Sequence, residues 1–303
     1  MRMVAGVGKT LGATLGAALM VATMGLTAAV AAEPSDEQHQ CAASTGVSPE
    51  QKLVSCTAVI TAGRETQQNL AVAFNNRGTA YLNKRDFDQA IADFDEAIRL
   101  DPKYVLAFNG RGLAYQGKGQ SERAIAEFDQ SIALNPKNAV AFYFRANVYR
   151  GKGRYDRAIQ DFDQAIALSP NYASAFFGRA LAYQDKTQWD FDAYLNEGQY
   201  EDRALKDYDE AIRLAPNNRA AYNNRGNVYL SKRQYDRAIK DYDEAVRLDP
   251  NEPLYIKNRG NAFRITGQYD RAIADFRKAL TLKLDEPVKR QIETALKELG
   301  AAG

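Results

Sequence analysis

The chain has 303 residues, with 40 Lys and Arg against 38 Asp and Glu, and its formal net charge is +2 at pH 7. Because no long run of Lys or Arg stands out, the clustered basic charge of a nucleic-acid surface is missing, and we expect no nucleic-acid partner. A single histidine and two cysteines leave no material for a metal site built from these residues, so we expect no metal and no cofactor.

Residues 1–32 have the pattern of a secretory signal peptide. Arg2 and Lys9 form a basic start, residues 10–32 carry no charge, and small residues at 29–31 provide a cleavage pattern. We therefore expect removal of residues 1–32 and a periplasmic or secreted protein. An uncleaved N-terminal membrane anchor is the alternative, because the uncharged run is long enough to span a bilayer. Beyond this segment we expect no contact with a membrane.

Residues 33–48 are polar, and we predict an irregular linker there. A helix is expected to follow, because Ser48 can cap it, Pro49 suits its first position and Gln51 can complete a capping box. This helix places Cys56 on its apolar face and matches the second helix of the repeated unit described below. We therefore predict that residues 49–70 form a half-repeat that caps the start of the array.

Cys41 and Cys56 are the two cysteines of the chain. In an oxidising compartment such a pair usually forms a disulfide. The bond would close a loop of about 15 residues and contribute on the order of 3 kcal/mol. The spacing is not C-x-x-C, which disfavours a redox role. Two buried free thiols remain the alternative.

A unit that is first clear at residues 71–104 returns until about residue 286. Prolines close the units at positions 102, 136, 170, 216 and 250, which gives three spacings of 34 residues and one of 46. Self-similarity at a fixed period indicates one elongated array rather than separate globular domains. The six predicted units span residues 71–104, 105–138, 139–172, 173–218, 219–252 and 253–286.

Each unit is predicted to consist of two helices, expected at about 71–84 and 87–100 in the first copy. Aromatic residues recur seven positions apart in the first helix, and an Ala precedes an aromatic residue by four positions in the second. Such spacings place the residues on one helical face. In the first copy these residues are Phe74, Tyr81, Ala90 and Phe94.

These residues resemble the tetratricopeptide repeat, of the secreted or periplasmic bacterial type. Gly78 and Tyr81 of the first helix fit the pattern, as do the Ala, Phe and Pro of the second helix, and the resemblance covers about residues 71–286. It implies an all-α fold, a right-handed α-solenoid of helix-turn-helix repeats with a concave face lined by the first helices. In the final copy Leu284 stands where Pro is expected.

An arginine occupies the first-helix slot that the family usually gives to Leu, in all six copies: Arg77, Arg111, Arg145, Arg179, Arg225 and Arg259. One acidic row runs through the second helices: Asp93, Glu127, Asp161, Asp207, Asp241 and Asp275. Another comprises Asp95, Asp129, Asp163, Asp209 and Asp243. We predict an internal Arg–carboxylate ladder between paired helices. The alternative is that the arginines form a basic stripe that binds an acidic ligand. The acidic rows disfavour this alternative, because their negative charges would cancel the positive field of the stripe.

Asparagines recur at the first-helix positions expected on the concave face. A carboxamide both donates and accepts hydrogen bonds, so a row of them can hold the main chain of an extended peptide. The predicted peptide-binding residues are Asn75, Asn76, Asn109, Tyr143, Asn223, Asn224, Asn227, Lys257, Asn258 and Asn261. In related tetratricopeptide domains, Asn at such slots contacts peptide backbone or a terminal carboxylate. Here Lys257 is the clearest basic residue for a carboxylate clamp, so backbone binding is favoured over capture of a chain end. The alternative is that these asparagines bind no ligand.

The fourth unit carries 12 extra residues around 186–200. Insertions in repeats often map to the binding face, and aromatic residues can anchor a partner there. Trp189, Phe191 and Tyr194 are therefore predicted as a possible partner anchor. The alternative is that the insertion only lengthens the two helices, which then pack on each other.

After residue 286, Pro287 begins a predicted capping helix within residues 287–303, with a charged outer face. The sequence lacks a Gly-rich phosphate loop and a G-x-S-x-G elbow, and we expect no enzymatic activity. We predict a non-enzymatic scaffold that binds proteins or peptides on its concave face. The alternative is a self-associating structural or assembly protein of the cell envelope. Nothing in the sequence specifies the oligomeric state.

Overall fold

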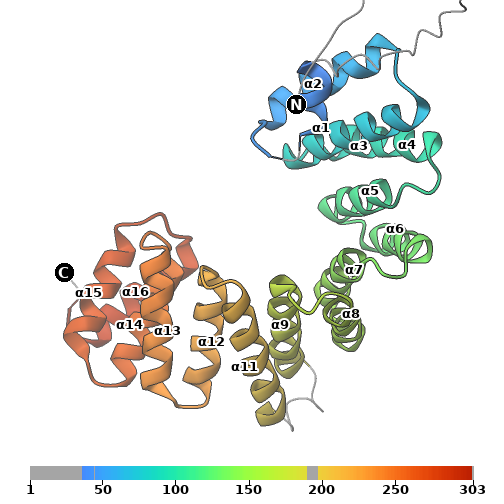
Figure 1. Ribbon diagram of the computed structural model, residues 1–303. Coiled ribbons are helices and arrows are strands. Elements are labelled where there is room, and N and C mark those ends of the chain that lie inside the picture. The colour runs from blue at the N-terminus through green and yellow to red at the C-terminus, as the bar shows by residue number, and fades with distance from the viewer. Residues whose placement is uncertain (1–35, 44, 190–196, 302–303) are drawn as a thin grey trace, which may run out of the picture. The chain divides into compact units, whose positions relative to one another are not determined.

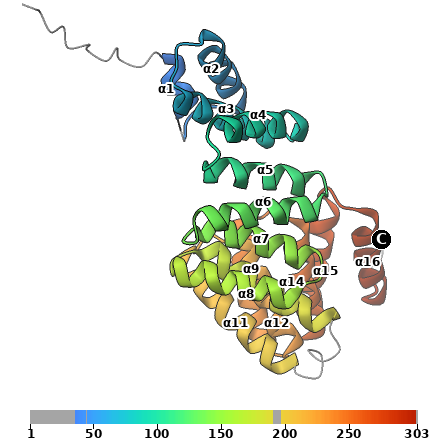
Figure 2. The same ribbon diagram turned by 90° about the vertical axis from the view of Figure 1, so that its right-hand side faces the viewer.

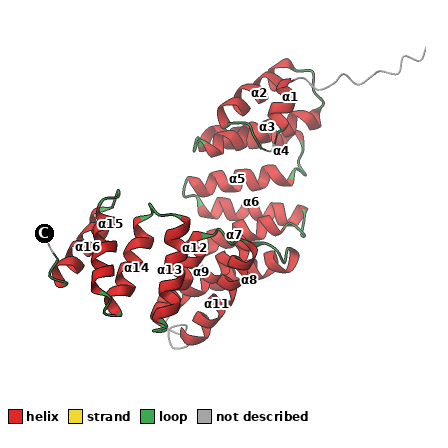
Figure 3. Ribbon diagram, turned by 60° about the vertical axis from the view of Figure 1, so that its left-hand side comes forward, coloured by secondary structure: helices red, strands yellow, loops and turns green. Residues whose placement is uncertain are grey.

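A computed structural model describes residues 36–43, 45–189 and 197–301. These residues form 15 α-helices and no strand, which confirms the predicted all-α fold class (Figures 1 and 3). Residues 1–32, Phe191 and Tyr194 lie outside the described residues, so the structure leaves the predicted signal peptide and this part of the insertion untested.

Six helical pairs make up the repeats. They are α3 (Gln67–Asn83) with α4 (Phe87–Leu100), α5 (Val105–Gly117) with α6 (Ser121–Leu134), α7 (Ala139–Gly151) with α8 (Tyr155–Leu168), α9 (Ala173–Trp189) with α11 (Glu197–Leu214), α12 (Arg219–Ser231) with α13 (Tyr235–Leu248), and α14 (Pro253–Ile265) with α15 (Tyr269–Leu280). Each second helix also packs against the first helix of the next pair. The chain is therefore a solenoid of helix-turn-helix units, and a last helix, α16 (Glu286–Glu298), packs against α15 (Figure 2).

Small and aromatic side chains bring the two helices of each pair together. In the second copy, a Cβ atom on Gly112 would lie 2.7 Å from the ring of Phe128, so the ring packs directly against the backbone of the first helix. Phe128 and its equivalents in the other copies are fully buried: Phe94, Phe162, Tyr208, Tyr242 and Phe276. The interior of the array is thus built from the slots that recur in every copy.

The insertion in the fourth unit lengthens both of its helices. Helix α9 has 17 residues and α11 has 18, against 13 and 14 in the pair that precedes them. Trp189 is the last residue of α9, and its side chain lies outside the described residues. The predicted partner anchor at Trp189, Phe191 and Tyr194 therefore remains a prediction.

The N-terminal end begins with the predicted capping box. Helix α2 (Pro49–Ala62) starts after Ser48, whose Oγ accepts from the backbone N–H of Gln51 at 3.2 Å. The Ser48 backbone N–H donates in return to Oε1 of Gln51 at 3.0 Å. Helix α3 starts at Gln67, four residues before the expected start of the first repeat, because Thr66 caps it with its side chain.

Residues 33–48 differ from the predicted irregular linker, because Asp36–Ala42 form helix α1. The predicted disulfide is present: Cys41 and Cys56 are bonded, with their Cα atoms 4.7 Å apart, and both are buried. A helix of seven residues is too short to be stable in isolation, and packing against α2 holds it in place. So short a segment also gives little helical signal in the sequence. The cap is therefore a short disulfide-linked hairpin rather than the single helix expected from the sequence.

The predicted Arg–carboxylate ladder is confirmed, and from the second copy onward each rung joins two repeats. In the fifth copy, Nε and Nη2 of Arg225 donate to the two carboxylate oxygens of Asp241 at 2.8 and 2.7 Å. Nη1 of the same arginine donates to Asp209 of the fourth copy at 2.6 Å. The first acidic row thus binds within a repeat and the second row binds across to the next one. We refer to these rungs together as the ladder.

Two rungs of the ladder differ from the others. In the first copy no repeat precedes Arg77, and its Nη1 donates to Oγ1 of Thr57 in the cap at 3.2 Å. In the second copy the carboxylate belongs to Glu127, which accepts from Nη2 of Arg111 at 2.7 Å and from no other described side chain. The Nε of Arg111 is buried and has no acceptor among the described residues. Burial raises the pKa of Glu127, because the Arg111 bond offsets desolvation only in part.

Candidate peptide-binding surface

Three slots around each ladder arginine vary from copy to copy, and together they form what we call the first-helix surface. They are Asn75, Asn76 and Thr79; Asn109, Gly110 and Leu113; Tyr143, Phe144 and Asn147; Phe177, Gly178 and Leu181; Asn223, Asn224 and Asn227; and Lys257, Asn258 and Asn261. Neighbouring first helices touch one another along α3, α5, α7 and α9, and again between α12 and α14. The surface is polar in copies one, five and six and largely apolar between them.

The asparagines of copies five and six bond mainly to one another. Asn258 Nδ2 donates to Oδ1 of Asn223 at 2.9 Å and to Oδ1 of Asn227 at 3.5 Å. Asn223 Nδ2 donates to Asn224 at 3.0 Å, and the hydroxyl of Tyr242 donates to Asn227 at 2.8 Å. Asn223 is only 3% exposed. The structure therefore brings these predicted residues together, but as a network that ties α12 to α14.

The asparagines of the first copy bind the N-terminal cap. Asn75 is buried and donates to Oδ1 of Asn76 at 3.3 Å, and Asn76 donates to the main-chain carbonyl of Cys41 at 3.1 Å. A carboxamide of this surface thus holds a main-chain carbonyl, but the carbonyl is one of the chain's own. These two residues lie against α1 and leave little capacity for a ligand.

Asn109 of the second copy is separate from both asparagine groups. It is 5% exposed, and its Oδ1 is buried without a hydrogen-bond partner among the described residues. The following residue is Gly110, where the first copy has Asn76. A Cβ at Gly110 would lie 2.4 Å from the ring of Phe94, so the slot that would supply a partner to Asn109 is filled by that ring.

Aromatic side chains gather on the middle of the surface. The ring of Tyr143 lies 5.5 Å from that of Phe144 and 5.1 Å from that of Tyr172, between ring centres. Phe177 follows in the next copy, with its ring 6.0 Å from that of Tyr208. Tyr143, Phe144, Tyr172 and Phe177 are each half-buried, and we call them the aromatic cluster. Burial raises the pKa of Tyr172 to about 12, so its hydroxyl is neutral.

Tyr172 was not among the residues predicted from the sequence. It lies two residues after Pro170, in the turn between repeats rather than on a first helix. Tyr104 occupies the same slot after Pro102. A comparison of the turns between repeats would therefore have identified Tyr172 as a recurring aromatic position.

Lys257 and Asn261 lie near the C-terminal helix. Lys257 Nζ donates to Oε1 of Gln291 in α16 at 3.3 Å, and burial lowers the pKa of this lysine. Asn261 lines a pocket between α14 and α16 together with Gln291. These two predicted residues are therefore directed at α16 and stand apart from the network of Asn223 and Asn258.

Across the part of the chain that the structure describes, no group of three or more His, Cys, Asp or Glu side chains is arranged to hold a metal ion. The same residues include no helix that is both long and apolar enough to cross a membrane.

Models of the tetratricopeptide repeat match the chain at residues 71–104 and 220–252, 106–138 and 258–286, and 127–160. A model described as a TPR repeat matches residues 146–186 and 192–232. These segments together span most of residues 71–286. No curated protein matches the sequence.

Solved structures with the same arrangement of helices are distant in sequence. Pseudomonas aeruginosa PilF is 16% identical with a TM-score of 0.65, over 76% of this chain and 100% of that one. A tetratricopeptide repeat protein of Parabacteroides merdae is 19% identical with a TM-score of 0.57, over 80% and 90%. Human IFIT1, solved with PPP-AAAA, is 15% identical with a TM-score of 0.62, over 83% and 59%. At these identities the likeness extends to the fold alone.

Proposed function

The chain belongs to the tetratricopeptide repeat family, and from this we propose that it is a non-catalytic scaffold that binds a protein partner through an extended peptide segment. The observation that carries the proposal is the aromatic cluster on the first-helix surface. Rigid aromatic side chains supply much of the binding energy in protein interfaces. We therefore assign the main anchoring contacts to Tyr143, Phe144, Tyr172 and Phe177.

The asparagines take a smaller part in this proposal than the sequence suggested. Asn223, Asn227 and Asn258 already bond to one another, and Asn76 already holds Cys41. Asn224 and Asn261 have side-chain N–H groups that donate to none of the described residues. Peptide main chain would therefore be held at these two positions, with the anchoring side chain on the aromatic cluster.

Peptides selected from a random library against residues 33–303 would test the proposal. We expect the selected peptides to share a large aromatic or aliphatic residue, and Tyr143→Ala to weaken their binding roughly thirtyfold, as for a residue that contributes about 2 kcal/mol. Tyr269→Ala is the matched control, since Tyr269 is 54% exposed on α15, a second helix. Equal loss in both variants, or no loss in either, would contradict the assignment.

We also propose that the mature protein begins after residue 32 and works outside the cytoplasm. The disulfide between Cys41 and Cys56 supports this, because such bonds persist in oxidising compartments. Intact mass of the protein isolated from its native cells would give the N-terminus directly. A mass that includes residues 1–32 would favour the retained anchor instead.

Self-association at the N-terminal end is a second candidate function. The outward side of α2 carries Val54, which is 72% exposed, with Ala58 and Ala62 also exposed, whereas the outward side of α16 is charged. Light scattering of the mature protein over a range of concentrations would reveal such association. Val54→Lys should abolish it, and a monomer at all concentrations would exclude it.

A further inference from the structure

Helix α1 lies over the first copy's end of the first-helix surface. It packs against both α2 and α3, and the main-chain carbonyl of Cys41 accepts from Nδ2 of Asn76, a residue of that surface, at 3.1 Å. The side chain of Cys41 completes a small buried cluster, whose other members are Cys56, Val59 and Ala73. Removal of α1 would therefore uncover the Asn76 carboxamide and an apolar face that α2 and α3 form together.

The disulfide is the main link that holds α1 in this position. Among the seven residues of the helix, only Cys41 is buried, so α1 contributes little apolar burial of its own. Ser55 donates to Oε1 of Gln40 at 2.9 Å, and Lys52 donates to the main-chain carbonyl of Ala43 at 2.5 Å. Such polar contacts stabilise only modestly, because water replaces them when they break, and a helix of this length is not stable alone. The position of α1 therefore depends on its covalent link to α2.

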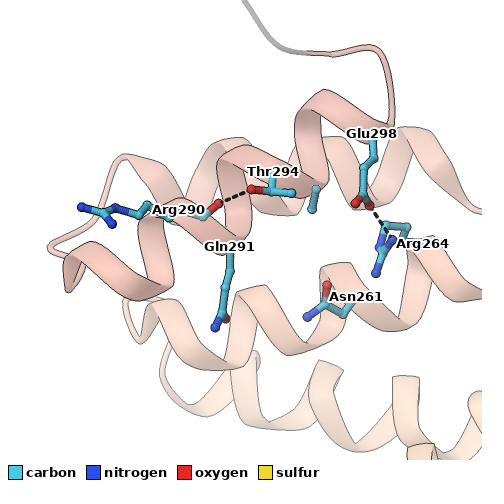
Figure 4. A pocket seen from close by; sticks show the side chains of 7 residues that line it. Asn261, Arg264, Arg290, Gln291, Thr294 and Glu298 are labelled. Carbon is cyan, nitrogen blue, oxygen red and sulfur yellow. Dashed lines mark hydrogen bonds and ion pairs between the residues drawn. The ribbon is translucent and has the colours of Figure 1, made fainter.

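The helix at the other end of the array is held in a different way. Helix α16 buries Ile292, Ala295 and Leu296 in the cluster that also contains the core of the last repeat. Across the gap to α14, Arg264 pairs with Glu298 at 3.0 Å (Figure 4). The C-terminal helix is thus retained by its own apolar residues, whereas α1 is retained by a bond that a reductant can open.

We propose that α1 is a redox-controlled cover, which the intact disulfide holds over the first copy and which reduction releases. The reductant is a dithiol, such as the C-x-x-C pair of a thiol-disulfide oxidoreductase. Cys41 and Cys56 are then the substrate of that enzyme and not a catalytic pair themselves. The proposal rests on the proposed function and deepens it, because the state of one bond decides whether a peptide anchored on the aromatic cluster can also reach α3.

The release is a thiol–disulfide exchange in two steps. A thiolate of the dithiol attacks Sγ of Cys41, which is 3% exposed against 0% for Cys56, and the electron pair of the broken S–S bond leaves on Sγ of Cys56, which takes up a proton. The second thiolate of the dithiol then attacks the first, which forms the disulfide of the reductant and frees Cys41 to take up a proton. The chain gains two electrons and two protons. Local opening of α1 exposes the bond to attack, since the helix has one buried residue.

Hydrogen exchange of residues 33–303 before and after reduction with dithiothreitol tests the release. We expect the amides of α1 to exchange slowly in the oxidised protein and as fast as in an unfolded chain after reduction. The amides of α2 and α16 should keep their protection, because α2 also packs against α3 and α16 has its own buried residues. A double variant, Cys41→Ser with Cys56→Ser, should behave like the reduced protein. Slow exchange of α1 after reduction would overturn the proposal. So would equal loss of protection in α1 and α2, since the whole cap would then unfold.

Peptide binding tests the consequence of the release. Library peptides selected against the reduced protein should bind it about fivefold more tightly than the oxidised protein, as for one additional hydrogen bond. Asn76→Ala should remove this preference, because α1 occupies that side chain in the oxidised protein. Asn69→Ala is the matched control, since Asn69 is an exposed asparagine of the same helix that donates to Glu65, and it should leave the preference unchanged. If peptides require Tyr143 but never distinguish the two redox forms, only the cover is wrong. If α1 is released but no peptide requires Tyr143, the proposed function is wrong and the release stands.

Discussion

The ladder arginines and the first-helix surface lie on the same six helices, whereas the ladder carboxylates lie on the second helices. Arg225 of the ladder is preceded directly by Asn224 of the surface, and the same adjacency relates Arg145 to Phe144 and Arg179 to Gly178. The arginine slot is identical in all copies, whereas its neighbours range from Asn through Phe to Gly. The two regions therefore obey different constraints although their residues are adjacent in the chain.

The contacts explain this difference. A ladder arginine binds one carboxylate in its own repeat and another in the preceding repeat. Both carboxylates recur along the array, and the forked guanidinium group of arginine can bind both of them at once, so the same residue type is needed in each copy. A surface side chain meets neighbours that differ from copy to copy, as Asn76 meets the cap whereas Asn227 meets Tyr242 of its own copy. Asn258 is intermediate, because its partners Asn223 and Asn227 are present in one neighbour and absent elsewhere. We therefore expect ladder substitutions to change stability and most surface substitutions to change binding.

Breaking a ladder rung should have the largest effect on stability. Arg225→Leu would leave Asp241, which is 6% exposed, buried without its cation. Removing one partner of a buried ion pair typically costs about 3–5 kcal/mol. Urea unfolding should show a clearly lower midpoint, and hydrogen exchange should speed up in α12 and α13. Arg213→Leu is the control, because its pair with Glu210 is exposed and should contribute about 0–1 kcal/mol.

Asn258→Ala should cost appreciable stability although Asn258 belongs to the first-helix surface. It removes the donor to Asn223, whose Oδ1 then lies buried without a partner, at a cost of about 1–3 kcal/mol. Asn261→Ala removes no hydrogen bond to a described residue and should leave the urea midpoint nearly unchanged. If both variants were equally stable, Asn258 would belong with the binding residues and not with the structural network.

Much of this division could be predicted from the sequence. The period of 34 residues placed the repeats, and the matching Arg and acidic rows predicted the ladder, because both partners occur in every copy. The capping box at Ser48 could likewise be predicted, because its two residues are close in sequence. The disulfide could be predicted because Cys41 and Cys56 are the two cysteines of the chain.

Features that depend on one particular neighbour could not be predicted. Asn258 bonds to Asn223, 35 residues earlier, and nothing in either repeat alone indicates that the two amides meet. Helix α1 has too few residues to show an apolar period, and its packing on α2 decides its structure. Tyr172 reaches the aromatic cluster from a turn, where helical periodicity carries no information.

Repairing the second rung should increase stability. Glu127→Asp would let Arg111 bond through both Nε and Nη2, as Arg145 does with Asp161 at 2.8 and 2.7 Å. Satisfying the buried Nε should add about 1 kcal/mol. A higher urea midpoint with unchanged peptide binding is the expected outcome. Asp161→Glu in the third copy should reverse the effect and lower the midpoint. A loss of stability in Glu127→Asp would show that the longer side chain fills space that aspartate leaves empty.

The smallest effect concerns a second, exposed set of ion pairs along the edge of the array. In most copies a lysine near the end of the first helix binds an acid near the start of the preceding second helix, as in Lys118 with Asp88, Lys152 with Glu122 and Lys232 with Asp202. The sixth copy has Thr266 at this slot, and Thr266 lines a pocket together with Asp236.

Thr266→Lys would give Asp236 a cation and should raise stability by about 0.2–1 kcal/mol at low salt. The gain should shrink as salt is added, because exposed pairs are screened, whereas the effect of Glu127→Asp should persist. Urea midpoints of the two variants at low and high salt would show this contrast. Equal salt dependence in both would mean that the second rung of the ladder is as accessible to solvent as the edge pairs, against its burial in the structure.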